Sequence, residues 1–354
     1  MRLLRCIVVL ASGLTFGACG VARAANDGAF ASRELRIIVG SESGGGYDVY
    51  ARLASPFLGK YLPGAPTVIV QNLPGAGGLK VANYMVKIAP RDGSTIAITN
   101  RNLIAAPLLK MVDRENVQYD PMSFTWLANL NTDVSFLIAR AATGVASLDD
   151  LRGRDFIVGS TTPTDNNGLF PYIFNNLLGT RFRVVSGYPS SNEMALAMDR
   201  SEIDGVVGFS WSSLQAQRPD WLRDGYVRLL MQLGLTPHPE ARDVPLMLDF
   251  VRDDINHQAL ELIATLNTLG RPFFGPPGMP SEAVKNLREA FAHVAVDTDF
   301  LEMARRENLD VTFTDGATLQ ETVARMNSVR PEIAAAATRA LARRATSVDS
   351  LPKR

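Results

Sequence analysis

The sequence predicts an α/β protein with two units, each a mostly parallel sheet flanked by helices. Three observations indicate this class. From Glu34 onward, short apolar runs alternate with segments of helical periodicity. Two glycine-rich turns, 40–48 and 71–78, each separate an apolar run from a helical segment, and a second series begins near Asp133. Such alternation is typical of parallel sheets covered on both faces, and 354 residues correspond to about two domains of ordinary size.

The first unit contains three predicted strands and two predicted helices. Apolar residues recur at helical spacing from Val49 to Tyr61 and from Leu79 to Ala89, and proline and glycine follow each helix. Asp48 stands at the predicted N-cap of the first helix. The strands are short runs of β-branched and aliphatic residues at 35–39, 67–70 and 95–99.

The second unit repeats this organisation. A polar turn at 159–167 precedes a helix marked by Leu169, Ile173 and Leu177. Residues 38–41 and 157–160 share the sequence Ile-Val-Gly-Ser at the same strand-to-turn junction. Both sheets would then present a turn rich in N–H groups at their carboxyl edges, where open α/β sheets bind ligands. The predicted strands of this unit are 135–139, 156–158, 183–185, 205–208 and 227–231.

The last third of the chain is predicted to be helical. One helix follows Pro280, a second covers about 319–326, and Pro331 opens an alanine-rich tail that carries Arg339, Arg343 and Arg344. We interpret the basic tail as a solvated helix, with a partner-binding surface as the alternative.

Residues 1–25 have the features of a secretory signal peptide. A positive start with Arg2 and Arg5 precedes a short apolar run, and Ala22-Arg23-Ala24 fits a cleavage site. A lipid anchor at Cys19 is the alternative. Both cysteines lie in this segment, so cleavage would leave a mature chain without thiols or disulfides. No later apolar run reaches the roughly 18 residues of a membrane span.

Charge and motif spacing argue against several classes of function. Without Arg2, Arg5 and Arg23 the chain has 33 basic and 36 acidic residues, which gives no support to nucleic-acid binding. The three histidines are scattered, so no metal site is expected. The glycine turns lack both the dinucleotide-binding spacing and a Walker lysine. A serine hydrolase using Ser210 remains an alternative, although the motif Gly-Phe-Ser-Trp-Ser lacks the final glycine of a nucleophile elbow.

The two glycine turns predict an anion site. Each precedes a helix, and the start of a helix offers unpaired N–H groups and a partial positive charge. Both turns lie at the carboxyl ends of neighbouring strands and would face the same end of one sheet. A small negatively charged molecule is therefore the expected ligand.

These motifs resemble the substrate-binding subunits of tripartite tricarboxylate transporters, the TctC/Bug family. The turn Gly44-Gly45-Gly46-Tyr47-Asp48 is similar to the family's P-G-G-G-x-D, and 72–78 to its E-N-R-P-G-A-G-G. Weaker matches continue through 188–196, 201–204, 227–233, 243–245 and 275–280, so the resemblance covers about 33–313. Ser43 and Leu73 depart from the pattern, the second-unit turn lacks the usual glycines, and 250–274 matches poorly. These departures put the identity of the ligand in doubt.

The resemblance implies a two-lobed type II periplasmic-binding-protein fold with a ligand cleft between the lobes. We expect lobe 1 to comprise 33–133, lobe 2 to comprise 134–235, and 236–354 to return to lobe 1 and form the C-terminal helices. The protein would bind a small carboxylate (a di- or tricarboxylate, an aromatic acid or an amino acid) in the periplasm as a monomer, without a cofactor or catalysis. It would deliver the ligand to the membrane subunits of a transporter. The alternative is that the protein acts as a ligand-sensing subunit for a sensor kinase.

Ligand-binding residues are expected on turns of both lobes. Backbone N–H groups of the glycine turns would hold the carboxylate, and Ser160, Thr161 and Thr162 would approach from lobe 2 under Tyr188. Asp48 is expected to cap its helix rather than contact the ligand. Leu73 and Trp211 are expected among the cleft side chains that set specificity. The predicted site comprises Ser43, Gly44, Gly45, Gly46, Tyr47, Asp48, Pro74, Gly75, Ala76, Gly77, Asn100, Ser160, Thr161, Thr162, Tyr188, Ser210 and Trp211.

Overall fold

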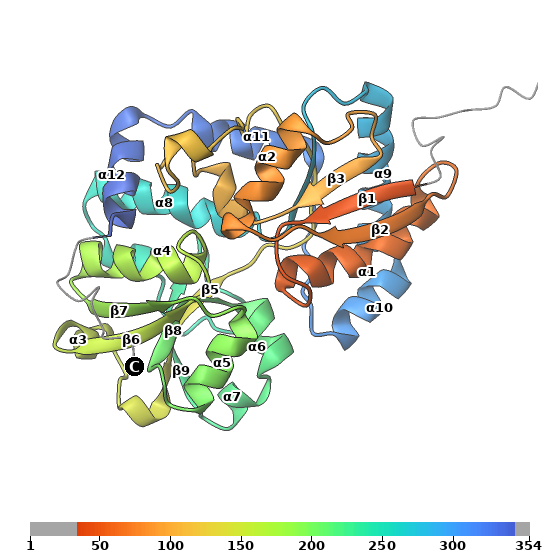
Figure 1. The fold of residues 1–354 in the computed structure, drawn as a ribbon. Coiled ribbons are helices and arrows are strands. Elements are labelled where there is room, and N and C mark those ends of the chain that lie inside the picture. The colour runs from red at the N-terminus through yellow and green to blue at the C-terminus, as the bar shows by residue number, and fades with distance from the viewer. Residues whose placement is uncertain (1–33, 344–354) are drawn as a thin grey trace, which may run out of the picture.

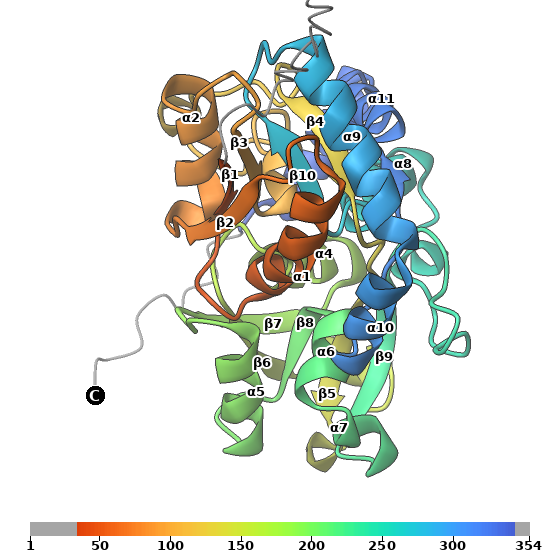
Figure 2. The same cartoon turned by 90° about the vertical axis from the view of Figure 1, so that its right-hand side faces the viewer.

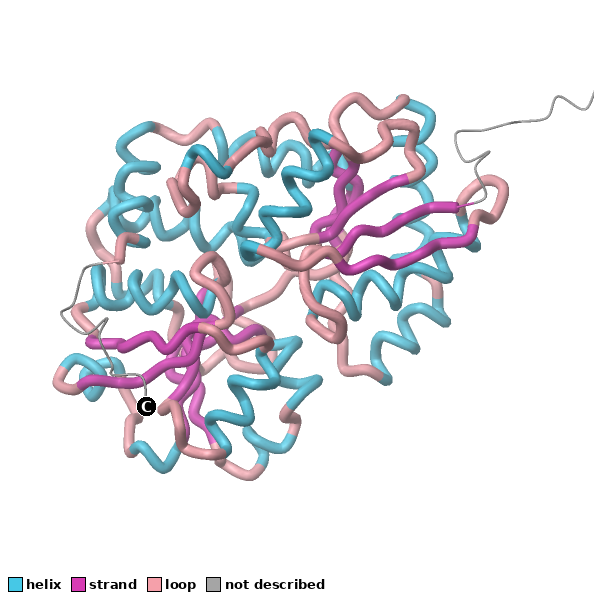
Figure 3. Tube along the Cα trace, viewed as in Figure 1, coloured by secondary structure: helices cyan, strands magenta, loops and turns pink. Residues whose placement is uncertain are grey.

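The computed structural model describes residues 34–343 and builds them around two sheets (Figure 1). The predicted signal peptide, its cleavage site and both cysteines lie outside the described residues. Figure 3 shows the strands in two separate groups, each surrounded by helices. This arrangement of mixed α/β layers agrees with the fold class that the sequence predicts. Among the described helices, none combines the length and apolarity that crossing a membrane requires.

The first sheet has the strand order β11-β4-β10-β3-β1-β2. Its parallel part is β2-β1-β3, and β10 pairs antiparallel with both β3 and β4. The two glycine turns follow the carboxyl ends of β1 and β2, which are neighbouring parallel strands, so the turns lie side by side. The strands are β1 (Glu34–Val39), β2 (Thr67–Asn72), β3 (Thr95–Ile98), β4 (Thr125–Asn129), β10 (Pro272–Gly275) and β11 (Thr314–Asp315).

The second sheet has the strand order β7-β6-β8-β5-β9. Strands β7, β6 and β8 are parallel, whereas β5 runs antiparallel to both β8 and β9. Most strands of each sheet therefore point in one direction, and β10 and β11 of the first sheet and β5 of the second run in the opposite direction. The strands are β5 (Ser135–Arg140), β6 (Asp155–Ser160), β7 (Arg181–Ser186), β8 (Gly205–Ser210) and β9 (Val227–Leu233).

Helices cover both sheets (Figures 1 and 2). Helices α1, α9 and α10 pack together beside the first sheet, and α4 packs on the second. The helices are α1 (Gly46–Tyr61), α2 (Leu79–Lys87), α3 (Leu148–Arg152), α4 (Asn166–Ile173), α5 (Ser191–Asp199), α6 (Trp211–Gln217), α7 (Asp220–Arg223), α8 (Asp254–Thr268), α9 (Ser281–Val296), α10 (Thr298–Arg306), α11 (Gly316–Asn327) and α12 (Pro331–Leu341). A π-helical turn η5 (Phe174–Leu178) extends α4, and short 3₁₀ turns include η1 (Ala76–Gly78) and η2 (Arg101–Ile104).

Two chain segments connect the lobes and lie against each other. Residues 130–134 lead from β4 to β5, and 267–271 lead from α8 back to β10. Backbone hydrogen bonds join them, from Gly270 N–H to Asn131 O at 2.8 Å and from Asp133 N–H to Asn267 O at 3.1 Å. Paired crossing segments of this kind are suited to act as a hinge.

The lobes also share an apolar core on one side. Helix α12 packs on α8 and on α4 and η5 of the second lobe. One continuous cluster of buried side chains includes Ile38 and Leu79 of the first lobe, Phe156 and Phe170 of the second, and Ile333 of α12. The side chain of Asn176 donates to the last carbonyls of α12, including Ala340 O at 2.9 Å, and so fixes the end of this helix on the second lobe.

Candidate functional site

A cavity of about 570 Å³ lies where the turns of the two sheets face each other. The first lobe contributes both glycine turns and the segment after β3. The second lobe contributes the β6–α4 turn and the segments that follow β7 and β8. Most of the predicted site residues line this cavity: Ser43, Gly45, Gly46, Tyr47, Pro74, Gly75, Ala76, Gly77, Asn100, Thr161, Thr162, Tyr188 and Ser210.

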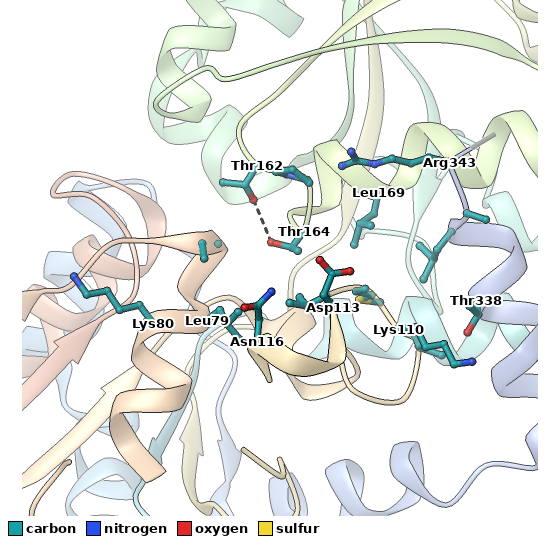
Figure 4. Close-up of a pocket in the computed structure, with 18 of the residues that line it drawn as sticks. Leu79, Lys80, Lys110, Asp113, Asn116, Thr162, Thr164, Leu169, Thr338 and Arg343 are labelled. Carbon is teal, nitrogen blue, oxygen red and sulfur yellow. Dashed lines mark hydrogen bonds between the residues drawn. The ribbon is translucent and has the colours of Figure 1, made fainter. Parts of the chain in front are cut away.

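A second, larger cavity of about 1010 Å³ shares Ala76, Gly77, Thr161 and Thr162 with the first. Figure 4 shows its lining, with Thr162 and Thr164 of the second lobe facing Leu79 and Asn116 of the first. Its chemistry is mixed, because aliphatic side chains alternate with exposed charged groups. We place the ligand site in the smaller cavity, because the glycine turns and two buried arginines line it.

Backbone N–H groups of the first lobe are free to bind an anion there. Among the described residues, no hydrogen-bond acceptor is recorded for the N–H of Gly46 or Tyr47, the first two residues of α1. The same holds for Gly75, Ala76 and Gly77 in the second turn. Unpaired donors at a helix start favour an anion.

Gly44 and Asp48 do not line the cavity, which corrects two expectations. Asp48 is the third residue of α1, and Gly45 occupies the N-cap position that was predicted for Asp48. Gly44 N–H donates to the Asp48 carboxylate at 2.8 Å and is therefore not available to a ligand. Burial opposes ionisation of Asp48, but hydrogen bonds from Arg52, Gly44 and Asn72 outweigh it and lower the pKa of this carboxyl group. The carboxylate thus stabilises the turn from inside.

Ser160, Trp211 and Leu73 also lie away from the cavity lining. Ser160 is fully buried, and its hydroxyl donates to Thr162 O at 3.1 Å. The Trp211 ring is buried against Phe136 and His238, because its position at the start of α6 directs it into the core of the second lobe. Leu73 packs against the shared apolar core instead of the cleft. Trp211 and Leu73 therefore do not line the cavity in which we expected them.

Arg101 and Arg271 line the cavity and were not predicted as site residues. Each is only 5% exposed. Arg101 begins η2 directly after β3, and its backbone N–H donates to the Tyr47 hydroxyl at 3.2 Å. Burial lowers the pKa of Arg101. Asn100, which the sequence singled out, is adjacent to Arg101 in the chain, but no local pattern distinguishes this arginine from a solvated one.

Polar side chains join the two lobes at one end of the cavity. The Asn100 side chain donates to Asp165 Oδ1 at 2.7 Å, and that of Asn102 donates to Thr164 O at 2.8 Å and Asn166 Oδ1 at 3.0 Å. Burial raises the pKa of Asp165, although hydrogen bonds from Thr161 and Thr162 oppose the effect. The lobes are therefore in direct contact in this structure.

The surroundings of Ser210 do not form a nucleophile–base pair. Its hydroxyl lies 3.0 Å from Ser212 Oγ and accepts from Ser213 N–H at 3.1 Å, which caps α6. No histidine is hydrogen-bonded to Ser210 in the described part of the chain. The nearby ring of His238 is stacked on Trp211. Within residues 34–343, no cluster of three or more metal-binding side chains occurs.

Comparison with known proteins gives a short sequence match. No family model matches the chain. A UPF0065 protein of Cupriavidus necator, encoded in the gbd 5′ region, is 34% identical over 102 residues, which are 28% of this chain and 29% of that protein. The match thus spans less than a third of this relative.

Solved structures match most of the chain. A TctC solute-binding protein from Polaromonas superposes with a TM-score of 0.60 at 20% identity, over 84% of this chain and 96% of that one. The periplasmic binding protein BugD gives 0.65 at 18% identity, over 85% and 95%. MatC from Rhodopseudomonas palustris, with bound malate, gives 0.63 at 18% identity, over 87% and 98%. The chain therefore has the fold of the TctC and Bug periplasmic binding proteins, as the resemblance of its glycine turns implies.

Proposed function

We propose that the protein is a periplasmic solute-binding protein that captures a small carboxylate-containing solute without catalysing a reaction. One observation carries the proposal. Gly46, Tyr47, Gly75, Ala76 and Gly77 line a cavity of about 570 Å³ between two lobes, and no acceptor is recorded for their N–H groups among the described residues. Such donors suit a carboxylate, because hydrogen bonds to an ionised acceptor are stronger than neutral ones. The malate bound to MatC, a structural neighbour, supports the same ligand class.

Ligand binding would be coupled to closure of the lobes. The crossing segments 130–134 and 267–271 would act as the hinge, and Asn100 and Asn102 would bond the second lobe in the closed state. A ligand shifts such an equilibrium by binding the closed state more tightly than the open one. The loaded protein would then present its ligand to the membrane subunits of a tripartite tricarboxylate-type transporter. This role presumes export by the proposed signal peptide of residues 1–25.

A thermal-shift screen of the mature protein tests the function. Mono-, di- and tricarboxylates, aromatic acids and amino acids would each be added in excess, with uncharged amides of the same skeletons as matched controls. A carboxylate at 100 times its dissociation constant should stabilise the fold by about 2.7 kcal/mol, while its amide should not. Absence of stabilisation by every carboxylate would refute the proposal.

A further inference from the structure

We propose that Arg271 is a positioning residue that couples the first glycine turn to closure of the lobes, because it meets Asp133 and Ser212 across the hinge. We call these three side chains the hinge latch. The inference rests on the proposed function, since closure has a role only where the cavity holds a ligand. The latch would act at the crossing segments, in addition to the contacts that Asn100 and Asn102 make between the lobes.

Arg271 is fixed to the first lobe. Its backbone N–H donates to Asn129 Oδ1 at 2.8 Å, and its backbone carbonyl accepts from Leu130 N–H at 3.2 Å. Its guanidinium lies 5.2 Å from the ring centroid of Tyr47 and 4.9 Å from that of Tyr50, both on α1. A cation over an aromatic face is held by electrostatic attraction. The charge therefore keeps its position relative to the start of α1.

The same guanidinium packs directly against the first glycine turn. A Cβ atom on Gly46 would lie 2.8 Å from Arg271 Nη2, which is closer than real Cβ contacts allow. No free space therefore remains between the arginine and the backbone whose N–H we assign to the ligand anion. A shift of the turn on ligand binding would be transmitted to the guanidinium.

The other half of the latch belongs to the second lobe. Ser212 is the second residue of α6, and its hydroxyl donates to Asp133 Oδ2 at 3.2 Å, just before β5. Both residues are buried, at 1% and 4% exposure. Ser212 Oγ also lies 3.0 Å from the hydroxyl of Ser210, which lines the cavity. This half is thus connected to the second wall of the ligand site.

The two halves meet where the chain crosses between the lobes. Arg271 Nη2 donates to Ser212 Oγ at 3.4 Å and lies 4.0 Å from the Asp133 carboxylate. Opposite charges attract more strongly in a buried site than in water. Rotation about the crossing segments would separate the halves and leave buried polar groups with fewer partners, which is costly. The latch therefore favours the closed arrangement.

Spin-label distances between the lobes test the latch in the ligand-free protein. The chain has no cysteine after residue 25, so Lys87→Cys on α2 and Asn192→Cys on α5 place one label on each lobe. Double electron–electron resonance then measures the ratio of closed to open molecules. We expect Ser212→Ala to lower this ratio by about 5- to 10-fold, because it removes a hydrogen bond to a charged partner without altering the cavity lining.

A buried hydroxyl elsewhere in the second lobe provides the matched control. Thr180 is 5% exposed, and its hydroxyl donates to Asn175 Oδ1 at 2.8 Å. We expect Thr180→Val to lose stability and keep the wild-type ratio of closed to open molecules. A double-mutant cycle of Ser212→Ala with Arg271→Gln should show coupling, because either substitution removes the same contact. A merely structural arginine would lower the melting temperature without such coupling.

A pair of glycine variants tests the link between the turn and the latch. Gly46→Ala would displace Arg271 Nη2, so we expect it to lower the closed-to-open ratio as Ser212→Ala does. Gly45→Ala is the control, because the nearest neighbours of its added Cβ are Glu42 and Ser41. It should leave the ratio within about 2-fold of wild type.

The outcomes separate the latch from the proposed function. An unchanged ratio in Ser212→Ala would overturn the inference, and so would an equal fall in Thr180→Val. Fold-changes of Ser212→Ala and Arg271→Gln that simply multiply in the double variant would show that the two groups do not act together. These measurements need no ligand, so failure of the latch leaves the proposed function intact. Failure of every carboxylate in the thermal-shift screen would instead refute the function alone.

Discussion

The turns after β1 and β6 start from the same four residues and have different chemistry. In the first lobe, the turn into α1 leaves the N–H groups of Gly46 and Tyr47 without partners. In the second lobe, Thr161 N–H donates to Asn167 Oδ1 at 2.9 Å, and the Thr161 hydroxyl donates to Asp165. A side chain therefore binds the N–H directly after the shared residues in the second turn, whereas the first two N–H groups of α4, like those of α1, have no recorded acceptor among the described residues.

This difference assigns distinct tasks to the two lobes. The first lobe offers fixed backbone donors, which recognise an anionic group but little else of a ligand. The second lobe offers hydroxyl and amide groups that are already held by neighbours, so they bound the cavity and contact the first lobe. The two lobes therefore differ in the polar side chains that surround their helix starts and in the second glycine turn, which only the first lobe has.

A bulky side chain between the second glycine turn and the β6–α4 turn should have the largest effect on ligand affinity. Gly77 has a φ of 61°, and a Cβ atom there would lie 2.0 Å from Thr164 Oγ1 of the second lobe. We expect Gly77→Val to weaken ligand binding by at least about 100-fold, because the lobes could not approach and the valine would also be strained. Isothermal titration calorimetry measures the loss.

The control for this variant is Gly144→Val. Gly144 has a similar φ of 74° and no heavy atom within 4 Å of the added Cβ, so the variant carries the backbone strain without the clash. It should lose stability and keep its affinity. Equal affinity losses in both variants would show that contact between the turns is not required for binding.

Removing the Asp48 carboxylate, which accepts hydrogen bonds from the first turn, should have an intermediate effect, and that effect is on stability. Asp48→Asn loses the ion pair with Arg52 at 2.9 Å and weakens the bond from Gly44 N–H. We expect the free energy of unfolding to fall by about 1 to 2 kcal/mol at neutral pH. Urea denaturation of this variant and of Glu42→Gln, an exposed neighbour, measures the difference.

The same variant should show a distinct pH dependence. The pKa of Asp48 is lower in the folded protein than in the unfolded chain, so its stabilisation is present above the ordinary carboxyl pKa of about 4 and is lost as pH falls further. The stability gap between wild type and Asp48→Asn should therefore shrink on acidification. A gap that stays constant from neutral pH to about pH 2 would contradict the role assigned to this carboxylate.

Freeing donors in the second turn should have the smallest effect. Asn167→Ala releases Thr161 N–H, whereas the Thr161 hydroxyl keeps its hydrogen bond to Asp165. We expect a loss of about 1 kcal/mol in stability and less than about 3-fold change in affinity, because this turn is not the main anion site. A tenfold or larger change in affinity, measured by calorimetry, would show that the lobes contribute more equally than we infer.

Features encoded by neighbouring residues were predictable from the sequence. The runs that form β1, β2 and β3, and the glycine turns after the first two, were predicted within a few residues. Their signals are local, since apolar runs and glycine positions restrict the backbone directly. Strands β4 and β10 and helix α8 were not predicted, because their positions depend on where the chain crosses between lobes. The direction of β5 was missed for the same reason.

Side-chain orientation was the less predictable part of the site. Trp211 follows β8 at the carboxyl edge, yet its ring is buried among Phe136 and His238. Arg271 is brought to the cavity by a segment almost 230 residues distant from the turn above it. A charged residue in a sequence is normally read as solvated, so a buried arginine is apparent only when long-range packing is known.

The apolar cluster that runs through α12, α8 and α4 has a consequence for how the molecule unfolds. Because Ile333 and Leu260 share one cluster with Phe156 and Phe170, loss of either lobe would expose apolar surface on the other. The two lobes should therefore melt in a single cooperative transition instead of two independent ones. A ligand held in the cavity would then raise the melting temperature of the entire protein, including helices that it never touches.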